Sequence, residues 1–335
     1  MKYAIVGAGA IGGYLGTKLA LAGEQVTFIA RNKNLAAINA NGFGLQLPDG
    51  STQHSSAVRA VQDPAEAGPQ DVVLLTTKAH QVAELLPGLR ALFGPETVVV
   101  TMINGVPWWY FQRLGGPFDG CTLSSVDPDG RLAAGIEVER IIGSIVYPAA
   151  ELVEPGLVKV IEGNRFSLGE LDGQRTPRIE SLSKSLMAAG FKAPVSRDIR
   201  SELWVKLWGN LSFNPISALT HATLEDICRF PLSRELAARM MKEAQAVGEK
   251  LGVEFKISLD QRIAGAEGVG AHKTSMLQDV EHGRGLELQA LVGSVVELAK
   301  ITETPTPTID AIYAAAALLT KVLADRGGRL EVQPA

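Results

Sequence analysis

The chain has 335 residues, enough for two domains, and its 46% hydrophobic and 20% charged residues are ordinary for a globular protein. A formal net charge of −4 with no long basic run argues against nucleic acid as a main partner. Cys121 and Cys228 lack any CxxC or Cys/His spacing, which argues against a structural zinc site and fits a reducing, cytoplasmic compartment. We expect neither a signal peptide nor an apolar run of the roughly 18 residues that a membrane span needs.

The first 30 residues have the pattern of a dinucleotide-binding unit. An apolar strand at residues 2 to 6 precedes a GxGxxG motif, a helical apolar repeat and a second strand at residues 25 to 30. In this context the first glycine permits a tight turn, the second lets the backbone approach a pyrophosphate, and the third allows close helix packing. The predicted cofactor-binding residues are Gly7, Ala8, Gly9, Ala10, Ile11 and Gly12.

The end of the second predicted strand bears on the choice of coenzyme. NAD enzymes usually place Asp or Glu there to bind the ribose 2′-hydroxyl, but this strand ends in Arg31-Asn32-Lys33. The guanidinium of Arg31 can hold a 2′-phosphate, which an acid would repel. Arg31 is alternatively a solvated loop charge, but the missing acid favours NADPH.

Two polar residues follow the predicted strands at residues 71 to 76 and 97 to 102. Parallel sheets bind ligands beyond the carboxyl ends of their strands, so we expect Lys78 to face cofactor or substrate and Asn104 to orient a nicotinamide or a substrate oxygen. The alternatives are a solvated lysine at a helix start and an Asn-Gly turn. The aromatic run that follows, Pro107 to Phe111, is either a plug at a domain interface or a wall of the substrate pocket.

The middle of the chain completes the first predicted domain. We expect strands or a hairpin at residues 43 to 58, and further strands of the same sheet between residues 121 and 170. A capped helix follows from Thr176-Pro177 to about residue 189, and then a last strand at residues 191 to 195. The predicted fold is an α/β Rossmann-type dinucleotide-binding domain over residues 1–197, followed by an all-helical domain over residues 198–335.

The apolar helix predicted at residues 204 to 219 carries a ladder of polar side chains. Lys206, Asn210 and Asn214 recur every four residues, so they share one face of the helix. A buried ammonium is costly unless it finds partners, and its lowered pKa suits a proton donor or base near neutral pH. The alternative is a partly exposed helix whose lysine reaches solvent.

Three apolar stripes predict long helices in the second domain, at residues 236 to 251, 291 to 299 and 309 to 323. Between the first two lies a polar stretch that Gly283 and Gly285 are expected to break. Its Ser275, Asp279 and Glu287 are candidates for the cleft, although the two carboxylates are alternatively surface charges.

Taken together, these motifs resemble the ketopantoate reductase family. The resemblance rests on the GxGxxG motif with Arg31, on the Lys206-x-x-x-Asn210-x-x-x-Asn214-Pro215 helix, and on Ser275-Met-Leu-Gln-Asp279 leading to Glu287. It implies NADPH-dependent reduction of 2-dehydropantoate to pantoate in pantothenate biosynthesis. It implies Lys206 as general acid and Glu287 as the carboxylate that orients lysine or substrate. The implied substrate-binding residues are Asn104, Asn210, Asn214 and Ser275, and the implied cofactor contacts include Lys78 and Asn104.

Two departures from the family pattern concern the substrate. The family's Asn-Gly is typically followed by small residues, whereas this chain continues into the aromatic run, and it is somewhat longer than a typical member. A bulkier 2-keto acid, a related dehydrogenase and a non-catalytic NADPH-sensing protein are therefore the alternatives. The apolar stripes face either a core or a partner, so a homodimer stays open.

Overall fold

The computed structural model describes residues 1–328, and packing divides the chain into two compact units. The first comprises residues 1–103, 107–122 and 129–199, and the second comprises residues 104–106, 123–128 and, of the described chain, 200–328. The predicted boundary after residue 197 thus lies two residues from the main division. The two short segments of the second unit were not foreseen, because they are separated from it in sequence.

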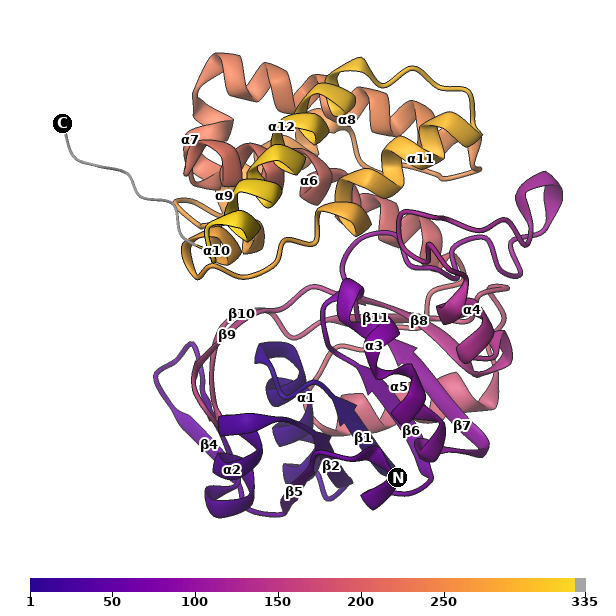
Figure 1. The fold of residues 1–335 in the computed structure, drawn as a ribbon, viewed down its shortest axis with the longest axis vertical. Coiled ribbons are helices and arrows are strands. Elements are labelled where there is room, and N and C mark those ends of the chain that lie inside the picture. Colours follow the sequence, from indigo (N-terminus) through magenta and orange to yellow (C-terminus); the bar gives the residue numbers. More distant parts are fainter. Residues whose placement is uncertain (329–335) are drawn as a thin grey trace. The chain divides into compact units, whose positions relative to one another are not determined.

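The first unit is built on a seven-stranded sheet in the order β11-β8-β7-β6-β1-β2-β5 (Figure 1). All pairings are parallel except that of β11 with β8. Strand interiors are apolar and buried, as expected for a sheet covered on both faces. The strands are β1 (Lys2–Val6), β2 (Gln25–Ile29), β5 (Val58–Val61), β6 (Gln70–Leu75), β7 (Phe93–Thr101), β8 (Ile141–Val146) and β11 (Phe166–Gly169).

A second, four-stranded sheet corrects part of the sequence prediction. The hairpin expected after residue 43 is confirmed, since β3 (Phe43–Gln46) and β4 (Thr52–Ser55) pair antiparallel. However, β9 (Ala149–Glu154) and β10 (Leu157–Glu162) do not extend the first sheet: β10 pairs with β3 to give the order β4-β3-β10-β9. The sequence pattern indicates which residues form strands, whereas long-range packing decides which strands pair with one another.

The strand predicted at residues 191 to 195 is also wrong. This segment makes only isolated bridges beside β11, in which the amides of Phe166 and Leu168 donate to the carbonyls of Lys192 and Pro194. Pro194 has no N–H to donate, so a continuous ladder cannot form there.

Besides short 3-10 turns, the described part of the first unit has five α-helices: α1 (Ala10–Leu21), α2 (Asn32–Asn41), α3 (Val82–Leu89), α4 (Arg131–Gly135) and α5 (Pro177–Ala188). The predicted cap of α5 is confirmed, because the side chain of Thr176 accepts from the amide of Ile179. Helix α1 packs closely on both sheets. A Cβ on Gly13 would lie 2.4 Å from the ring of Phe43, and one on Gly16 would lie 2.3 Å from the ring of Phe28.

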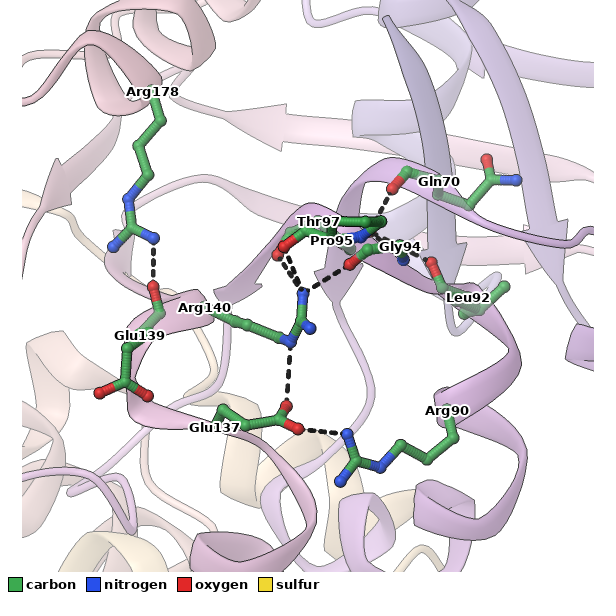
Figure 2. A network of polar contacts seen from close by, with 10 residues as sticks. All are labelled: Gln70, Arg90, Leu92, Gly94, Pro95, Thr97, Glu137, Glu139, Arg140 and Arg178. Carbon is green, nitrogen blue, oxygen red and sulfur yellow. Dashed lines mark hydrogen bonds and ion pairs between the residues drawn. The ribbon is translucent and has the colours of Figure 1, made fainter.

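A polar network fixes the entry to β7, the strand that leads to Asn104 (Figure 2). The guanidinium of Arg140 donates to the carbonyls of Gly94 at 2.8 Å, Thr97 at 3.3 Å and Pro95 at 3.4 Å. The carboxylate of Glu137 pairs with both Arg140 and Arg90. Arg90 is the chief cause that lowers the pKa of Glu137 to about 2. The network satisfies carbonyls in the first half of β7, where the register between β6 and β7 shifts.

The second unit consists of helices, as predicted. They are α6 (Ile199–Thr220, whose first residue belongs to the first unit), α7 (Leu224–Arg229), α8 (Pro231–Lys250), α9 (Leu259–Gly268), α10 (Ser275–Glu281), the π-helix η6 (Gln289–Gly293), α11 (Ser294–Ile301) and α12 (Pro307–Asp325). The expected break at Gly283 and Gly285 is present between α10 and η6. Residues 329–335, the end of the predicted second domain, lie outside the described residues.

Helix α12 qualifies the expectation about membranes. It has 19 residues and a mean hydropathy of 1.3, so it is long and apolar enough to span a bilayer by length and composition alone. Only 17% of the tested stretch is buried within the molecule. Because helices of water-soluble proteins pass the same test, the finding is weak evidence for a membrane.

Candidate functional site

The glycine-rich turn between β1 and α1 has the sterics that a dinucleotide site needs. Gly7 has φ +107, and a Cβ there would lie 2.7 Å from Cγ2 of Thr77. A Cβ on Gly12 would lie 2.0 Å from the carbonyl oxygen of Gly7, so only glycine lets the helix start so close to the strand. A Cβ on Gly9 would meet nothing within 4 Å, which leaves the amino end of α1 open to an anion.

A hollow of about 340 Å³ in the first unit adjoins this turn. The ends of β1 and β2, the start of α2 and one face of α3 form its walls. Its lining includes Gly7, Ala8, Gly9, Arg31, Asn34, Thr77, Gln81 and Glu84. Arg31 is the residue before α2 and its side chain is exposed. The first turn of α2 contains no acid, so both the helix end and the guanidinium present positive charge here.

Thr76, which sequence reasoning missed, ties β6 to the glycine-rich turn. Its hydroxyl donates to the carbonyls of Val6 at 3.0 Å and Gly7 at 2.8 Å. The only signal in the sequence was its place at a strand end. Lys78, two residues on, precedes the short 3-10 turn Ala79–Gln81, and its backbone amide donates to the side chain of Gln81 at 3.3 Å.

The second unit brings together three predicted site residues that are far apart in sequence. Nζ of Lys206 on α6 donates to Oδ1 of Asn104 at 2.6 Å, and Nδ2 of Asn104 donates to Oε2 of Glu287 at 3.4 Å. The amide of Asn104 therefore lies between an amine and a carboxylate. Burial lowers the pKa of Lys206 to about 8, while the charge of Glu287 acts in the opposite direction.

The loop carrying Asn104 is seated on the π-helix η6. The amide of Val106 donates to the carbonyl of Ala290 at 2.8 Å, and that carbonyl also accepts from the hydroxyl of Ser294 at 2.7 Å. Gly105 has φ +84, and a Cβ there would lie 2.2 Å from the same carbonyl. A π-helix changes which carbonyls are available, and here one of them holds the loop in place.

The remaining predicted substrate residues lie on α6 and α10. Asn210 follows Lys206 by one helical turn and is partly buried, and Asn214 is buried one turn further on. Within the described residues, neither amide has a hydrogen-bond partner, which leaves them available to a polar ligand. Ser275 is exposed at the start of α10. Asp279, in contrast, is buried and pairs with Arg284 at 2.8 Å, so at least part of its role is local.

The aromatic run after Asn104 belongs mainly to the core of the first unit. The indole N–H of Trp109 donates to the hydroxyl of Thr101 at 2.8 Å, and its ring lies against Gly143. Tyr110 and Phe111 are fully buried and contact each other edge to face. Trp109 therefore anchors the first unit's own core, a role that differs from both the interface plug and the pocket wall expected from the sequence. No group of three or more metal-ligating side chains is present in residues 1–328.

Comparison with known proteins identifies the family. Residues 3–115 match the model described as ketopantoate reductase PanE/ApbA, and residues 198–320 match the model of its C-terminal part. The chain is 52% identical to a 2-dehydropantoate 2-reductase of Mesorhizobium japonicum over 98% of its own length and 99% of the relative's. The chain belongs to the ketopantoate reductase family. The predicted fold class, a Rossmann-type domain followed by a helical one, is confirmed.

Solved structures agree with this assignment. A candidate ketopantoate reductase from Ralstonia solanacearum MolK2 has a TM-score of 0.91 at 40% identity and covers 96% of this chain and 98% of its own. A D-mandelate dehydrogenase solved with NADH and anilino(oxo)acetate has a TM-score of 0.83 at 21% identity and covers 97% and 100% of the two chains, which shows a shared fold alone. Membership in this family implies a nicotinamide coenzyme, NADH or NADPH.

Proposed function

We propose that this chain reduces 2-dehydropantoate, a 2-keto acid, to pantoate with NADPH. The proposal rests above all on the cluster of Lys206, Asn104 and Glu287, which joins an amine of lowered pKa to an amide and a carboxylate. The close relative in Mesorhizobium japonicum carries the same activity in its name.

The chemistry required is the addition of hydride to a ketone. A bound nicotinamide coenzyme would supply hydride to C2 of the substrate, and the electron pair of the carbonyl bond would then move onto its oxygen. The ammonium of Lys206 donates a proton to that oxygen, which yields the hydroxyl and a neutral amine that solvent reprotonates. A cation placed where negative charge develops also stabilises the transition state. Glu287 favours the charged form of Lys206 and, through Asn104, fixes where the amine lies.

Neutral side chains suited to the substrate oxygens follow Lys206 on α6. Asn210 and Asn214 offer amide groups along the same helix, and we assign them to the substrate's carbonyl or hydroxyl oxygens, with Ser275 as a further contact. Neutral amides bind such oxygens without adding a charge that competes with Lys206. Asn104 is assigned to both substrate and nicotinamide, and Lys78 to the coenzyme.

The preference for NADPH is inferred from the charge at the end of β2. Gly7 to Gly12 would hold the pyrophosphate, and the side chain of Arg31 with the amino end of α2 would hold the 2′-phosphate. Glu84, on the α3 side of the same hollow, is an acid and would repel a 2′-phosphate. The preference for NADPH over NADH therefore depends on the positive charge of Arg31. Arg31→Ala should weaken NADPH binding at least tenfold and leave NADH binding within about twofold. Equal weakening of both coenzymes would refute the assignment.

The decisive test is loss of NADPH absorbance with 2-dehydropantoate, run beside a panel of bulkier 2-keto acids. We expect 2-dehydropantoate to have the highest kcat/KM. The indole of Trp109 is hydrogen-bonded to Thr101 in the core of the first unit, so it is not available to select a bulkier substrate. Turnover restricted to bulkier acids would keep the mechanism and change the substrate. NADPH binding without any turnover would favour a sensor instead.

We also propose that the protein forms a homodimer. Phe230, Leu232 and Leu318 of the second unit expose 59%, 68% and 62% of their surface, and we assign these apolar side chains to the contact surface. Light scattering on the purified protein would show twice the chain mass, and a monomer at micromolar concentration would contradict the proposal.

A further inference from the structure

The side chain of Asn34 on α2 joins the glycine-rich turn to the second sheet. Its Nδ2 donates to the carbonyl of Ala8 at 2.8 Å, and its Oδ1 accepts from the amide of Gly156 at 3.1 Å. The amide orientation follows from its partners, because the flipped group would place oxygen against oxygen and N–H against N–H. Gly156 lies in the β9–β10 turn, and its own carbonyl accepts from the amide of Gly44 in β3 at 2.8 Å. The second sheet thus fixes the side chain of Asn34 through Gly156.

The bond to Ala8 determines the direction of the next backbone amide. In a trans peptide the C=O and N–H groups point to opposite sides. With the carbonyl of Ala8 held toward Asn34, the N–H of Gly9 points away from α2. A Cβ on Gly9 would meet nothing within 4 Å, so the space around this residue is open. Ala8, Gly9, Arg31 and Asn34 line the same hollow.

We propose that Asn34 is a positioning residue for coenzyme binding, which orients the Ala8–Gly9 peptide so that its N–H meets the pyrophosphate. This inference rests on the proposed coenzyme site. The two residues at the start of α2 then have different roles. Arg31 recognises the 2′-phosphate, whereas Asn34 acts on binding of the pyrophosphate, which NADPH and NADH share. Asn34 itself need not touch the coenzyme.

The same helix supplies a matched control. Asn39 also makes two hydrogen bonds with backbone, from its Nδ2 to the carbonyl of Ala60 at 2.8 Å and to its Oδ1 from the amide of Ala60 at 2.8 Å. It does not line the hollow. Asn34→Ala and Asn39→Ala therefore remove equal numbers of similar bonds from α2, and we expect similar decreases in melting temperature.

The experiment measures dissociation constants of NADPH, NADH and 2′-AMP by fluorescence or calorimetric titration of the full-length protein. The probe 2′-AMP carries the phosphate that Arg31 is proposed to bind but lacks a pyrophosphate. Asn34→Ala should weaken NADPH and NADH equally, by about three- to tenfold, as expected for one misdirected hydrogen bond, and leave 2′-AMP within about twofold. Asn34→Asp should weaken both dinucleotides further, since a carboxylate repels both the Ala8 carbonyl and the phosphates.

Two results would overturn the inference. One is an Asn34→Ala protein whose dinucleotide affinities equal those of Asn39→Ala. The other is a loss of 2′-AMP affinity as large as that of NADPH, which would mean general disruption of α2. A wild-type protein that binds neither dinucleotide would refute the coenzyme site as a whole, and this outcome is distinguishable because the wild type is measured first.

Discussion

Reduction by this enzyme should depend on pH through Lys206. The amine must be protonated to donate to the substrate oxygen, and burial lowers its pKa from 10.5 to about 8. Between pH 7 and pH 9 the protonated fraction of such a group falls about tenfold, whereas a lysine of ordinary pKa stays almost fully charged. We therefore expect kcat/KM for keto-acid reduction to fall about tenfold over this interval. This ratio reports the free enzyme, which is the state described here.

The assay follows NADPH oxidation at low substrate concentration across this range. Glu287→Gln should move the falling limb to lower pH, because the charge of Glu287 raises the pKa of Lys206. Lys206→Met should lower kcat/KM by about 10² or more with NADPH affinity unchanged. A profile that stays flat to pH 10 in the wild type, or a Lys206→Met protein with near-normal turnover, would refute Lys206 as the acid.

Stability gives an independent check on the same pKa. Since the folded pKa lies below the unfolded one, the unfolded chain binds more protons between about pH 8 and 10.5, and stability rises with pH in that window. Below pH 8 the charged amine costs the fold up to about 3 kcal/mol. Lys206→Met should accordingly be more resistant to urea than the wild type at pH 7, and a loss of stability there would contradict the burial argument.

Four further substitutions test the framework around the site. Gly12→Ala should lower the free energy of unfolding by about 1–3 kcal/mol, because its Cβ would lie 2.0 Å from the Gly7 carbonyl. Gly9→Ala should keep the wild-type melting temperature but weaken coenzyme binding, because its Cβ would meet nothing within 4 Å of the protein. Equal melting temperatures for the two variants would contradict this expectation. Gly105→Ala should lower kcat, since it displaces Asn104 from Lys206, and an unchanged kcat would show that this placement is unimportant. Arg140→Met should lower the free energy of unfolding, measured by urea denaturation, by about 1–3 kcal/mol. No change would mean that solvent replaces the contacts of Arg140 with backbone carbonyls.

The sequence alone determined the local parts of this protein. The GxGxxG turn, the charge at Arg31 and the polar ladder on α6 are patterns within a single element or turn. Their meaning follows from helical periodicity and from the sterics of glycine, neither of which needs a distant partner. The cap of α5 and the β3–β4 hairpin were predictable for the same reason.

Only the tertiary structure decided which distant residues meet. Asn104 is more than a hundred residues from Lys206, and its place beside that amine and Glu287 depends on the seat of Gly105 on η6. No local pattern encodes such a contact, since a π-helix and the carbonyl that it presents to the loop are not visible as a sequence period. The pairing of β10 with β3 and the link from Asn34 to Gly156 are long-range contacts of the same kind. Local propensity cannot specify them, because they arise from packing between segments that are far apart in the chain.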